Sequence, residues 1–222
     1  MPLATVHLVR HGEVHNPDRI LYGRIPGYGL SDLGRRMAED LGGWFAQRAE
    51  DTGRVPALLI SSPLQRARET AAPIGAALGL QIGTDERVLE ATNRFEGLAG
   101  VKGQLRNPRY WPLLVNPFRP SWGEPYRAQV ARMAEAVQDL RDRALAQDGE
   151  GAEAIIVSHQ LPIWVTRLSL EGRPLWHDPR QRECTLTSVT SLHFEAGRAL
   201  PRVEYQEPNA ALLPQASSLP GA

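Results

Sequence analysis

The sequence predicts an α/β fold, a three-layer sandwich in which helices cover both faces of a mainly parallel central sheet. Short apolar runs, rich in β-branched residues, alternate along the chain with longer segments whose apolar residues recur at helical spacing. The runs are almost continuously apolar, as expected of parallel strands that are buried on both faces. Three of them are followed directly by polar or charged residues, a pattern typical of strand ends that form a binding edge.

A long loop separates the first expected strand from the first expected helix. Residues 5–9 are apolar and β-branched, which predicts a buried strand. The loop over 12–30 contains several Gly and Pro residues. Ser31 is a suitable N-cap, and the apolar residues after it recur at helical spacing, so we expect a helix over 32–50.

A second strand and helix follow in the same order. Residues 57–60 are apolar and predict another buried strand. Ser62 is placed to cap a helix that has Pro63 at its first position. We expect this helix to end at Gly79, because glycine adopts the left-handed conformation that closes many helices.

The rest of the chain contains a long insertion, the remaining elements and a tail. Residues 90–123 have little periodicity and several aromatic side chains, so we expect a lid-like insertion over a site. Residues 208–222 are rich in Pro, Ala and Ser and predict a loosely ordered tail after a single domain over 1–207. The other expected elements are a helix at 124–147, a strand at 154–157, a helix at 161–170 and closing strands at 185–194 and 199–205.

The composition limits the partners of the protein. Its 222 residues include 25 basic and 25 acidic side chains, so we expect neither nucleic acid nor a membrane surface as a partner. The single cysteine, Cys184, excludes an internal disulfide and a thiolate metal cluster. We find no signal peptide and no apolar run that could span a bilayer, and therefore expect a cytoplasmic protein. The sequence makes no prediction of the oligomeric state.

Arg10, His11 and Gly12 come directly after the first strand. Gly12 permits a tight turn and close backbone approach. A neutral imidazole is a capable nucleophile toward phosphorus when a hydrogen bond holds its other ring nitrogen, and a guanidinium fork matches phosphate oxygens. A packing or capping histidine would give the same tripeptide, so this motif alone does not decide the function.

Two further features indicate an anion site. Arg66 lies in the first turn of the second helix, where free N–H groups and the helix dipole favour an anion. One of Arg66 and Arg68 is expected on the solvated face of this helix, since the two side chains point in different directions. His159 follows Ser158 at the end of a very apolar strand, where its ring could donate to a phosphoryl oxygen. If these strands are neighbours, their ends meet at one edge of the sheet.

Taken together, these features resemble the histidine phosphatase superfamily, which includes phosphoglycerate mutases and broad-specificity phosphatases. The resemblance covers about residues 4–195 and implies a phosphoglycerate mutase-like fold. The matching motifs are Arg10-His11-Gly12-Glu13, Leu30-Ser31-x-x-Gly34, Ser61-Ser62-Pro63-Leu64-x-Arg66-Ala67, Glu90, Phe95-Glu96-Gly97, Gly123-Glu124 and Val157-Ser158-His159.

The resemblance implies roles for the matched residues. His11 would be the nucleophile that becomes phosphohistidine. Arg10, Arg66 and His159 would surround the transferred phosphoryl group and neutralise its oxygens. Phosphoryl transfer depends mainly on in-line positioning and charge stabilisation, so such fixed donors need no metal or other cofactor.

Three carboxylates lie near these motifs. Glu90 matches the acid that protonates the leaving oxygen and later activates water, with Glu96 as the rival. An acid of this kind needs a raised pKa, which burial favours and nearby arginines oppose. Glu13 is expected to orient loops rather than to take part in the chemistry.

Several positions depart from the family pattern. Val14 stands where relatives often carry Ser or Thr, and Asn16 falls about one residue early for a phosphate-loop asparagine. His15 or the Tyr22-Gly23-Arg24 segment could replace that contact. Gln160 replaces a glycine that often follows the second histidine, so its side chain could narrow the pocket or contact the substrate.

The leading hypothesis is a metal-independent phosphomonoesterase that acts on a small phosphorylated substrate. The alternatives are a cofactor-dependent phosphoglycerate mutase-type phosphomutase and a phospho-ligand-binding protein with little turnover. The insertion and tail are short for a mutase that must exclude water, which favours hydrolysis. Four residues of the insertion could bind a second anionic group or form a solvated loop surface: Arg94, Lys102, Arg106 and Arg109.

Overall fold

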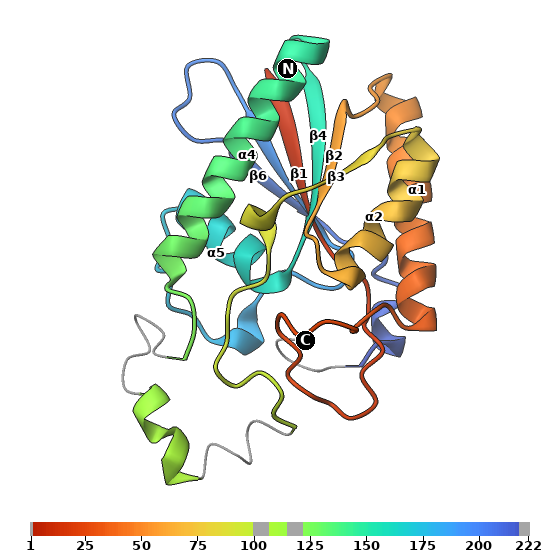
Figure 1. The fold of residues 1–222 in the computed structure, drawn as a ribbon. Helices are drawn as coiled ribbons and strands as arrows, with labels where there is room; N and C mark the ends of the chain where they lie inside the picture. Colours follow the sequence, from red (N-terminus) through yellow and green to blue (C-terminus); the bar gives the residue numbers. More distant parts are fainter. Residues whose placement is uncertain (1, 100–106, 115–121, 218–222) are drawn as a thin grey trace.

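The computed structural model describes residues 2–99, 107–114 and 122–217, and these form the three expected layers (Figure 1). The strands of the middle layer are β1 (Ala4–Arg10), β2 (Leu58–Ser61), β3 (Ile82–Thr84), β4 (Ala152–Ser158), β5 (Val189–Phe194) and β6 (Arg202–Gln206). Their order is β3-β2-β4-β1-β5-β6. The first four run parallel, whereas β5 pairs antiparallel with both β1 and β6. The sheet is therefore mainly parallel and has an antiparallel edge.

The outer layers consist of two helix pairs. Helices α1 (Asp32–Thr52) and α2 (Gln65–Leu78) lie side by side on one face of the sheet, and α4 (Tyr126–Asp148) and α5 (Gln160–Leu170) lie on the other (Figure 1). Short 3₁₀ helices occur at Glu86–Val88, Pro108–Leu114, Pro179–Gln181 and Leu213–Gln215. None of the helices in the described ranges has the length and apolar character needed to cross a membrane.

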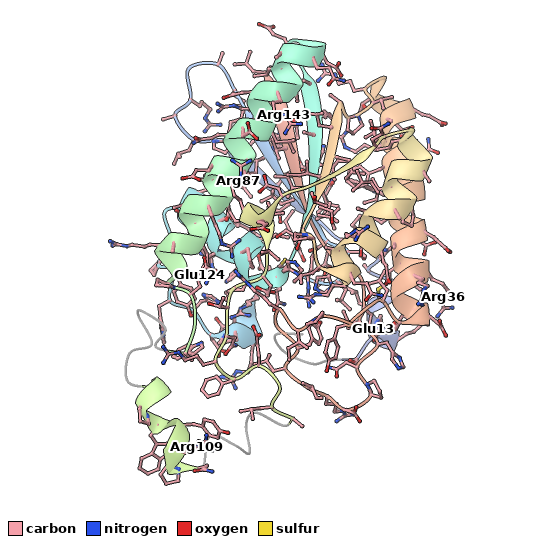
Figure 2. All side chains as sticks on the ribbon, in the orientation of Figure 1. Glu13, Arg36, Arg87, Arg109, Glu124 and Arg143 are labelled. Atoms are coloured by element: carbon pink, nitrogen blue, oxygen red, sulfur yellow. The ribbon has the colours of Figure 1, made fainter. Side chains whose placement is uncertain are left out.

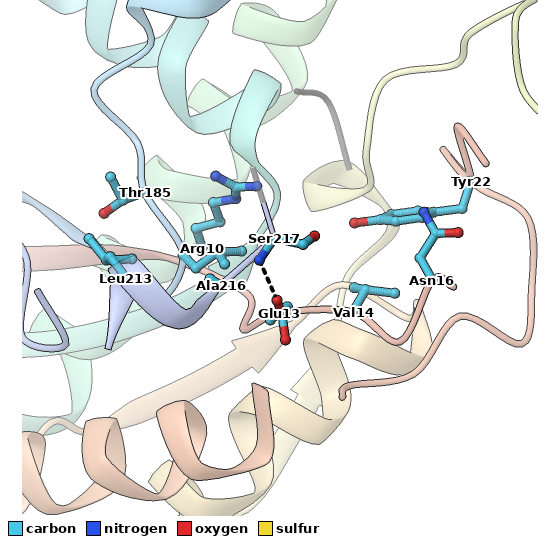
Figure 3. A pocket seen from close by; sticks show the side chains of 10 residues that line it. Arg10, Glu13, Val14, Asn16, Tyr22, Thr185, Leu213, Ala216 and Ser217 are labelled. Atoms are coloured by element: carbon cyan, nitrogen blue, oxygen red, sulfur yellow. Dashed lines mark hydrogen bonds between the residues drawn. The ribbon is translucent and has the colours of Figure 1, made fainter. Parts of the chain in front are cut away.

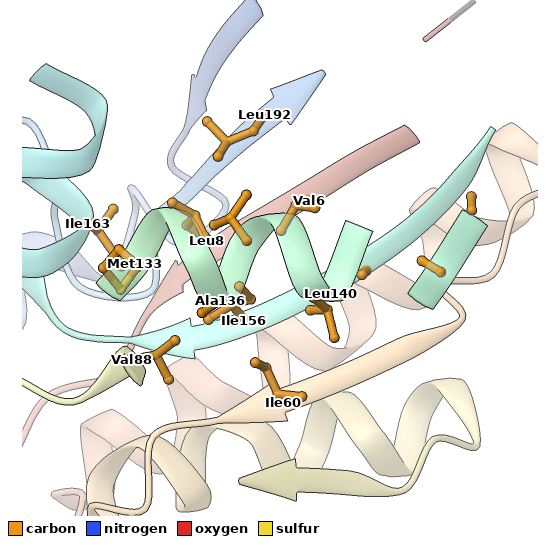
Figure 4. Close-up of a cluster of buried hydrophobic side chains, with 14 of the residues drawn as sticks. Val6, Leu8, Ile60, Val88, Met133, Ala136, Leu140, Ile156, Ile163 and Leu192 are labelled. Atoms are coloured by element: carbon orange, nitrogen blue, oxygen red, sulfur yellow. The ribbon is translucent and has the colours of Figure 1, made fainter. Parts of the chain in front are cut away.

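Two apolar clusters hold the layers together. In one, Met133 of α4 packs with Ile156 of β4 (Figure 4). In the other, Phe45 of α1 packs in the cluster that contains Ile155. Ile155 and Ile156 are consecutive residues of one strand and point to opposite faces, so β4 contributes to both clusters. This two-sided burial explains why the strand sequence is continuously apolar.

The ends of α1 follow the expected capping chemistry. The Ser31 hydroxyl accepts a hydrogen bond from the Gly34 backbone N–H at 2.9 Å. The helix continues two residues past the predicted end, to Thr52. It stops there because Gly53 adopts a left-handed conformation with φ of 65°.

The predicted start of α2 is wrong by two residues. The helix begins at Gln65 with Leu64 as its N-cap, and neither Ser62 nor Pro63 is helical. The Ser62 backbone N–H donates to the Val157 carbonyl at 2.9 Å, which keeps this residue extended beside β4. The helix ends at Gly79, as predicted.

The strands differ from the prediction at the antiparallel edge and at β3. β3 was not expected, because its three residues are exposed and lack an apolar run. β5 begins at Val189 rather than at 185, because Thr187 has a positive φ of 54° and the Ser188 N–H donates to the Thr185 carbonyl in a turn.

Parts of the insertion and of the tail lie within the described residues. In the insertion, the Phe95 ring contacts the Tyr110 ring, with centroids 5.8 Å apart. In the tail, the amide of Asn209 is buried and donates to the Met37 carbonyl at 2.7 Å and to the Thr187 hydroxyl at 2.9 Å. Lys102 and Arg106 lie outside the described residues, as do residues 218–222.

We expect Ile156→Ala to destabilise the protein by about 2–5 kcal/mol, because it leaves a cavity between β4 and α4. Urea denaturation measures this loss. The control is Val55→Ala, at a side chain that is 55% exposed, which should change the free energy of unfolding by less than about 0.5 kcal/mol. Equal losses in the two variants would contradict the two-sided burial of β4.

Candidate active site

The ends of three neighbouring strands form one cluster of polar side chains. β1 ends at Arg10 and His11, β2 at Ser61 and Ser62, and β4 at Ser158 and His159. These strands occupy adjacent places in the sheet. Hydrogen bonds continue the sheet past the strand ends, since the backbone N–H of His11 donates to the Ser158 carbonyl at 3.2 Å. The cluster therefore has a rigid backbone frame.

His11 has one protonated and one unprotonated ring nitrogen. Its side chain is buried, and Nδ1 lies 2.7 Å from the carbonyl oxygen of Gly12. A carbonyl can only accept, so Nδ1 carries the proton and Nε2 carries the lone pair. The Arg66 Nε–H donates to that lone pair at 3.2 Å. Burial, followed by the charges of Arg66 and Arg10, holds the pKa of His11 well below its usual value, which keeps the imidazole neutral.

Arg66 is held by neutral partners only. It is the second residue of α2 and is 1% exposed. Besides its contact with His11, its Nη2 donates to the Gly23 carbonyl at 2.7 Å, and its guanidinium lies 4.7 Å from the centre of the Tyr22 ring. Within the described residues no carboxylate lies within 4.0 Å of it. A buried cation without an anionic partner favours an anionic ligand.

His159 contributes a ring nitrogen with no acceptor. Its ring lies edge-on to the ring of His11, with centroids 5.2 Å apart. Nε2 lies 2.8 Å from the hydroxyl of Ser62, and among the described residues nothing hydrogen-bonds to the buried Nδ1. When the Ser62 hydroxyl donates to Nε2, Nδ1 carries a proton that a ligand oxygen can accept.

Arg10 connects this cluster to a cavity of about 230 Å³ (Figure 3). Its Nη1 donates to the Cys184 carbonyl at 2.7 Å. His11, Arg66 and His159 do not line the cavity. The other lining residues come from the loop after β1, from the segment before β5 and from the tail: Glu13, Val14, Asn16, Tyr22, Thr185, Leu186, Leu213, Ala216 and Ser217.

Glu90 is the carboxyl group with a raised pKa near this cluster. Burial raises its pKa, and this effect outweighs the Ala91 N–H, which donates to its side chain at 2.8 Å, and the charges of Arg66, Arg182 and Arg132. The net effect of burial and arginine charge is therefore a pKa above that of an exposed glutamate. The rival carboxylate, Glu96, instead accepts the Asn93 backbone N–H at 3.2 Å and closes its own turn.

Comparison with known proteins identifies this arrangement. The family model of the histidine phosphatase superfamily (branch 1) matches residues 6–205. The chain belongs to the histidine phosphatase superfamily. The uncharacterized protein Rv0525 of Mycobacterium tuberculosis is 51% identical over 213 residues, which cover 95% of this chain and 100% of that protein.

Two further proteins show the range of the superfamily. The probable phosphoglycerate mutase GpmB of Escherichia coli O1:K1 / APEC is 29% identical over 191 residues, with 83% of each chain covered. The structure of mycobacterial glucosyl-3-phosphoglycerate phosphatase Rv2419c superposes with a TM-score of 0.69 at 23% identity, covering 90% of this chain and 96% of that one. The latter similarity shows that the fold is shared, including the mainly parallel sheet.

Glu13 connects three segments of the histidine phosphatase fold in this chain. Its carboxylate accepts the Ser31 hydroxyl at 2.5 Å and the Ser217 backbone N–H at 2.7 Å (Figure 3). It thereby joins the loop after β1 to the cap of α1 and to the tail. These contacts agree with a role in orienting loops.

The residues that depart from the superfamily pattern have other partners here. The Asn16 amide donates to the Ile20 carbonyl at 2.8 Å and accepts the Ile20 N–H at 3.0 Å, so it closes its own loop beside the cavity. The Gly23 carbonyl accepts a hydrogen bond from Nη2 of Arg66. The Gln160 amide donates to the Cys184 carbonyl at 3.2 Å, the same oxygen that Arg10 contacts.

The sequence indicated the Tyr22-Gly23-Arg24 segment, and Tyr22 stacks on Arg66. Sequence reasoning missed Arg182, whose pKa is lowered by burial and is also shifted by the charges of Glu90 and Arg10. Arg182 lies in a segment without motif or periodicity, so only the tertiary fold reveals it. In the described part of the chain, no group of three His, Cys, Asp or Glu side chains is arranged to hold a metal ion.

We expect nitrogen NMR to show His11 as the neutral tautomer protonated on Nδ1 at neutral pH. Arg66→Gln should raise the pKa of His11, because it removes a positive charge beside the ring. The matched control is Arg68→Gln, two residues away and exposed, which should leave the titration unchanged. A doubly protonated His11 at neutral pH would contradict the geometry.

Proposed function

We propose that this member of the histidine phosphatase superfamily is a phosphomonoesterase that forms phosphohistidine on His11. The observation that carries the proposal is the 2.7 Å hydrogen bond from Nδ1 to the Gly12 carbonyl, which leaves Nε2 as the nucleophile. The proposed substrate is a small phosphorylated molecule. The reaction uses no metal or other cofactor, because fixed cationic and N–H donors stabilise the charge on the phosphoryl oxygens.

In the first step, the phosphoryl oxygens accept hydrogen bonds from Arg10, Arg66 and His159. The Nε2 lone pair of His11 attacks phosphorus, and the bond from phosphorus to the ester oxygen breaks. Protonated Glu90 gives its proton to that leaving oxygen, so the alcohol departs neutral and Glu90 becomes a carboxylate. Arg66 already contacts Nε2 and needs only to exchange that nitrogen for a phosphoryl oxygen.

In the second step, water replaces the alcohol. The Glu90 carboxylate accepts a proton from the water as its oxygen attacks phosphorus. The bond from phosphorus to Nε2 breaks, and the electron pair returns to the ring. Inorganic phosphate leaves, and both His11 and Glu90 regain their starting protonation states.

Two alternatives use the same residues. A mutase would pass the phosphoryl group from His11 back to an organic acceptor, and the similarity to GpmB favours this alternative. A phospho-ligand-binding protein would bind phosphate in the cluster with little turnover. The hydrogen bonds of the Asn16 side chain to Ile20 favour this second alternative, since they occupy both amide atoms that could otherwise contact a phosphate.

We expect His11→Ala to lower kcat for p-nitrophenyl phosphate roughly 10³-fold or more, because no other group can take the phosphoryl. The exposed His15 provides a matched control, and His15→Ala should retain activity. Rapid quenching of the wild type with labelled substrate should trap an acid-labile, alkali-stable adduct on His11.

Three results would contradict the hydrolase. One is turnover that survives His11→Ala. Another is efficient isomerisation of 3-phosphoglycerate in the presence of catalytic 2,3-bisphosphoglycerate without phosphate release, which would establish the mutase. The third is binding of inorganic phosphate without any turnover that depends on His11, which would establish the binding protein.

We expect activity toward alkyl phosphates to fall as pH rises through the raised pKa of Glu90, since the acid is then lost. On the acid side, activity should persist well below pH 6.5, because the lowered pKa of His11 keeps the nucleophile unprotonated. Glu90→Gln should lower kcat/KM for glycerol 3-phosphate about 10²–10⁴-fold and abolish this alkaline decline.

The control for this pH effect is p-nitrophenyl phosphate, whose leaving group departs without a proton. Its hydrolysis should be much less sensitive to Glu90→Gln. The ionisation of the substrate phosphate affects the wild type and the Glu90→Gln variant equally. The difference between their pH profiles therefore reports the ionisation of Glu90. Equal losses with both substrates would exclude Glu90 as the general acid.

A further inference from the structure

We propose that Arg182 binds a second anionic group of the substrate, a carboxylate or a second phosphate, next to the phosphoryl site; this inference rests on the proposed function. Arg182 lies between Pro179–Gln181 and Cys184, in the segment that leads into β5. Neither the superfamily motifs nor the steps proposed above use it.

Two neutral acceptors orient the Arg182 guanidinium. Its Nε donates to Nε2 of His177 at 2.9 Å, and its Nη1 donates to Oε1 of Gln160 at 3.3 Å. His177 must be protonated on Nδ1, because that nitrogen lies 2.8 Å from the Leu175 carbonyl. Burial lowers the pKa of His177, which keeps this imidazole neutral and able to accept.

The charge of Arg182 has no anionic partner in the described chain. No carboxylate of the described residues lies within 4.0 Å of it, and Nη2 has no hydrogen-bond partner among them. Other half-buried arginines are neutralised, as Arg48 is by Glu153 at 2.7 Å and Arg132 by Glu124 at 2.8 Å. Arg182 shares this feature with Arg66, the arginine beside His11.

Arg182 is adjacent to the phosphoryl site. The Gln160 side chain that accepts from Arg182 also donates to the Cys184 carbonyl, which Arg10 contacts as well. Electrostatics agree with this placement, because the charge of Glu90 raises the pKa of Arg182 and that of Arg10 lowers it. An anion at Arg182 would thus be joined to the phosphoryl group through a short carbon chain.

This arrangement assigns a function to Gln160 and His177. Both are positioning residues, since they accept from Nε and Nη1, whereas Nη2 has no partner among the described residues. A guanidinium fork suits the planar geometry of a carboxylate and the oxygens of a phosphate. The sequence indicated residues of the insertion for this role. Arg94 and Arg109 of that insertion are exposed, whereas Arg182 is half-buried.

The test compares two pairs of ligands that differ by one anionic group. Glycerol 3-phosphate and 3-phosphoglycerate differ by a carboxylate, whereas fructose 6-phosphate and fructose 1,6-bisphosphate differ by a phosphate. Affinities are measured by calorimetry in a His11→Ala background, where no turnover occurs, and kcat/KM is measured with His11 present. Calorimetry therefore tests Arg182 even if the chain is not a phosphatase.

Arg182→Gln should weaken binding of the doubly anionic member of at least one pair about 10–100-fold, and should leave the singly anionic member within about twofold. Arg182→Lys should recover part of the loss, since it keeps the charge without the fork. The control is Arg143→Gln on the far part of α4 (Figure 2), which should change neither affinity.

The pattern of losses decides the proposal. A loss confined to 3-phosphoglycerate indicates a carboxylate, and a loss confined to fructose 1,6-bisphosphate indicates a second phosphate. Equal weakening of all four ligands would show that Arg182 only supports the fold of the phosphoryl site. Unchanged affinities would overturn the proposal. Absence of turnover with intact His11, combined with selective losses in calorimetry, would reject the phosphatase but retain the second anion site.

Discussion

The hydrogen bond from His11 to the Gly12 carbonyl is the constraint on which the site depends. It fixes the tautomer, and with it the nitrogen that faces Arg66. The Gly12 backbone lies close against the start of α1, where there is no room for a side chain. A Cβ added at Gly12 would lie 2.7 Å from the Gly34 carbonyl oxygen, a distance that would force the backbone apart. The Gly12 N–H donates to the Thr70 hydroxyl of α2 at 3.0 Å, so both helices of this layer hold the turn.

Burial without ion pairing gives the site its electrostatic character. Arg66 and Arg182 are oriented by carbonyl, imidazole and amide acceptors, which direct a guanidinium without neutralising it. Their charge remains available to a ligand in surroundings that screen it less than water does. The same burial keeps His11 uncharged and raises the pKa of Glu90. One physical condition therefore produces a neutral imidazole, a carboxyl group that holds its proton more tightly than an exposed glutamate, and a field that attracts anions.

The sequence predicted the parts of the site that rest on sheet topology. Arg10, His11 and His159 follow apolar strands, and the carboxyl ends of neighbouring parallel strands must lie together. Local patterns misplaced Ser62, which looks like a helix cap but serves as the partner of His159, because its backbone remains bonded to β4. Arg182 escaped notice for a different reason. Its role depends on contacts with Gln160 and His177, which no local pattern of the sequence encodes.

In this structure the polar side chains of the cluster hydrogen-bond largely to one another, and a ligand must replace some of these bonds. Arg66 donates to the very lone pair that would attack phosphorus, so the nucleophile is occupied until a stronger acceptor draws the guanidinium away. A phosphoryl oxygen is such an acceptor, since it carries negative charge and the imidazole does not. In the proposed mechanism, binding of the anion would thus release the lone pair of His11 and at the same moment place Arg66 on the group to be transferred. A neutral ligand would offer no comparable exchange, so the buried arginine would make nucleophilic attack depend on the charge of the substrate.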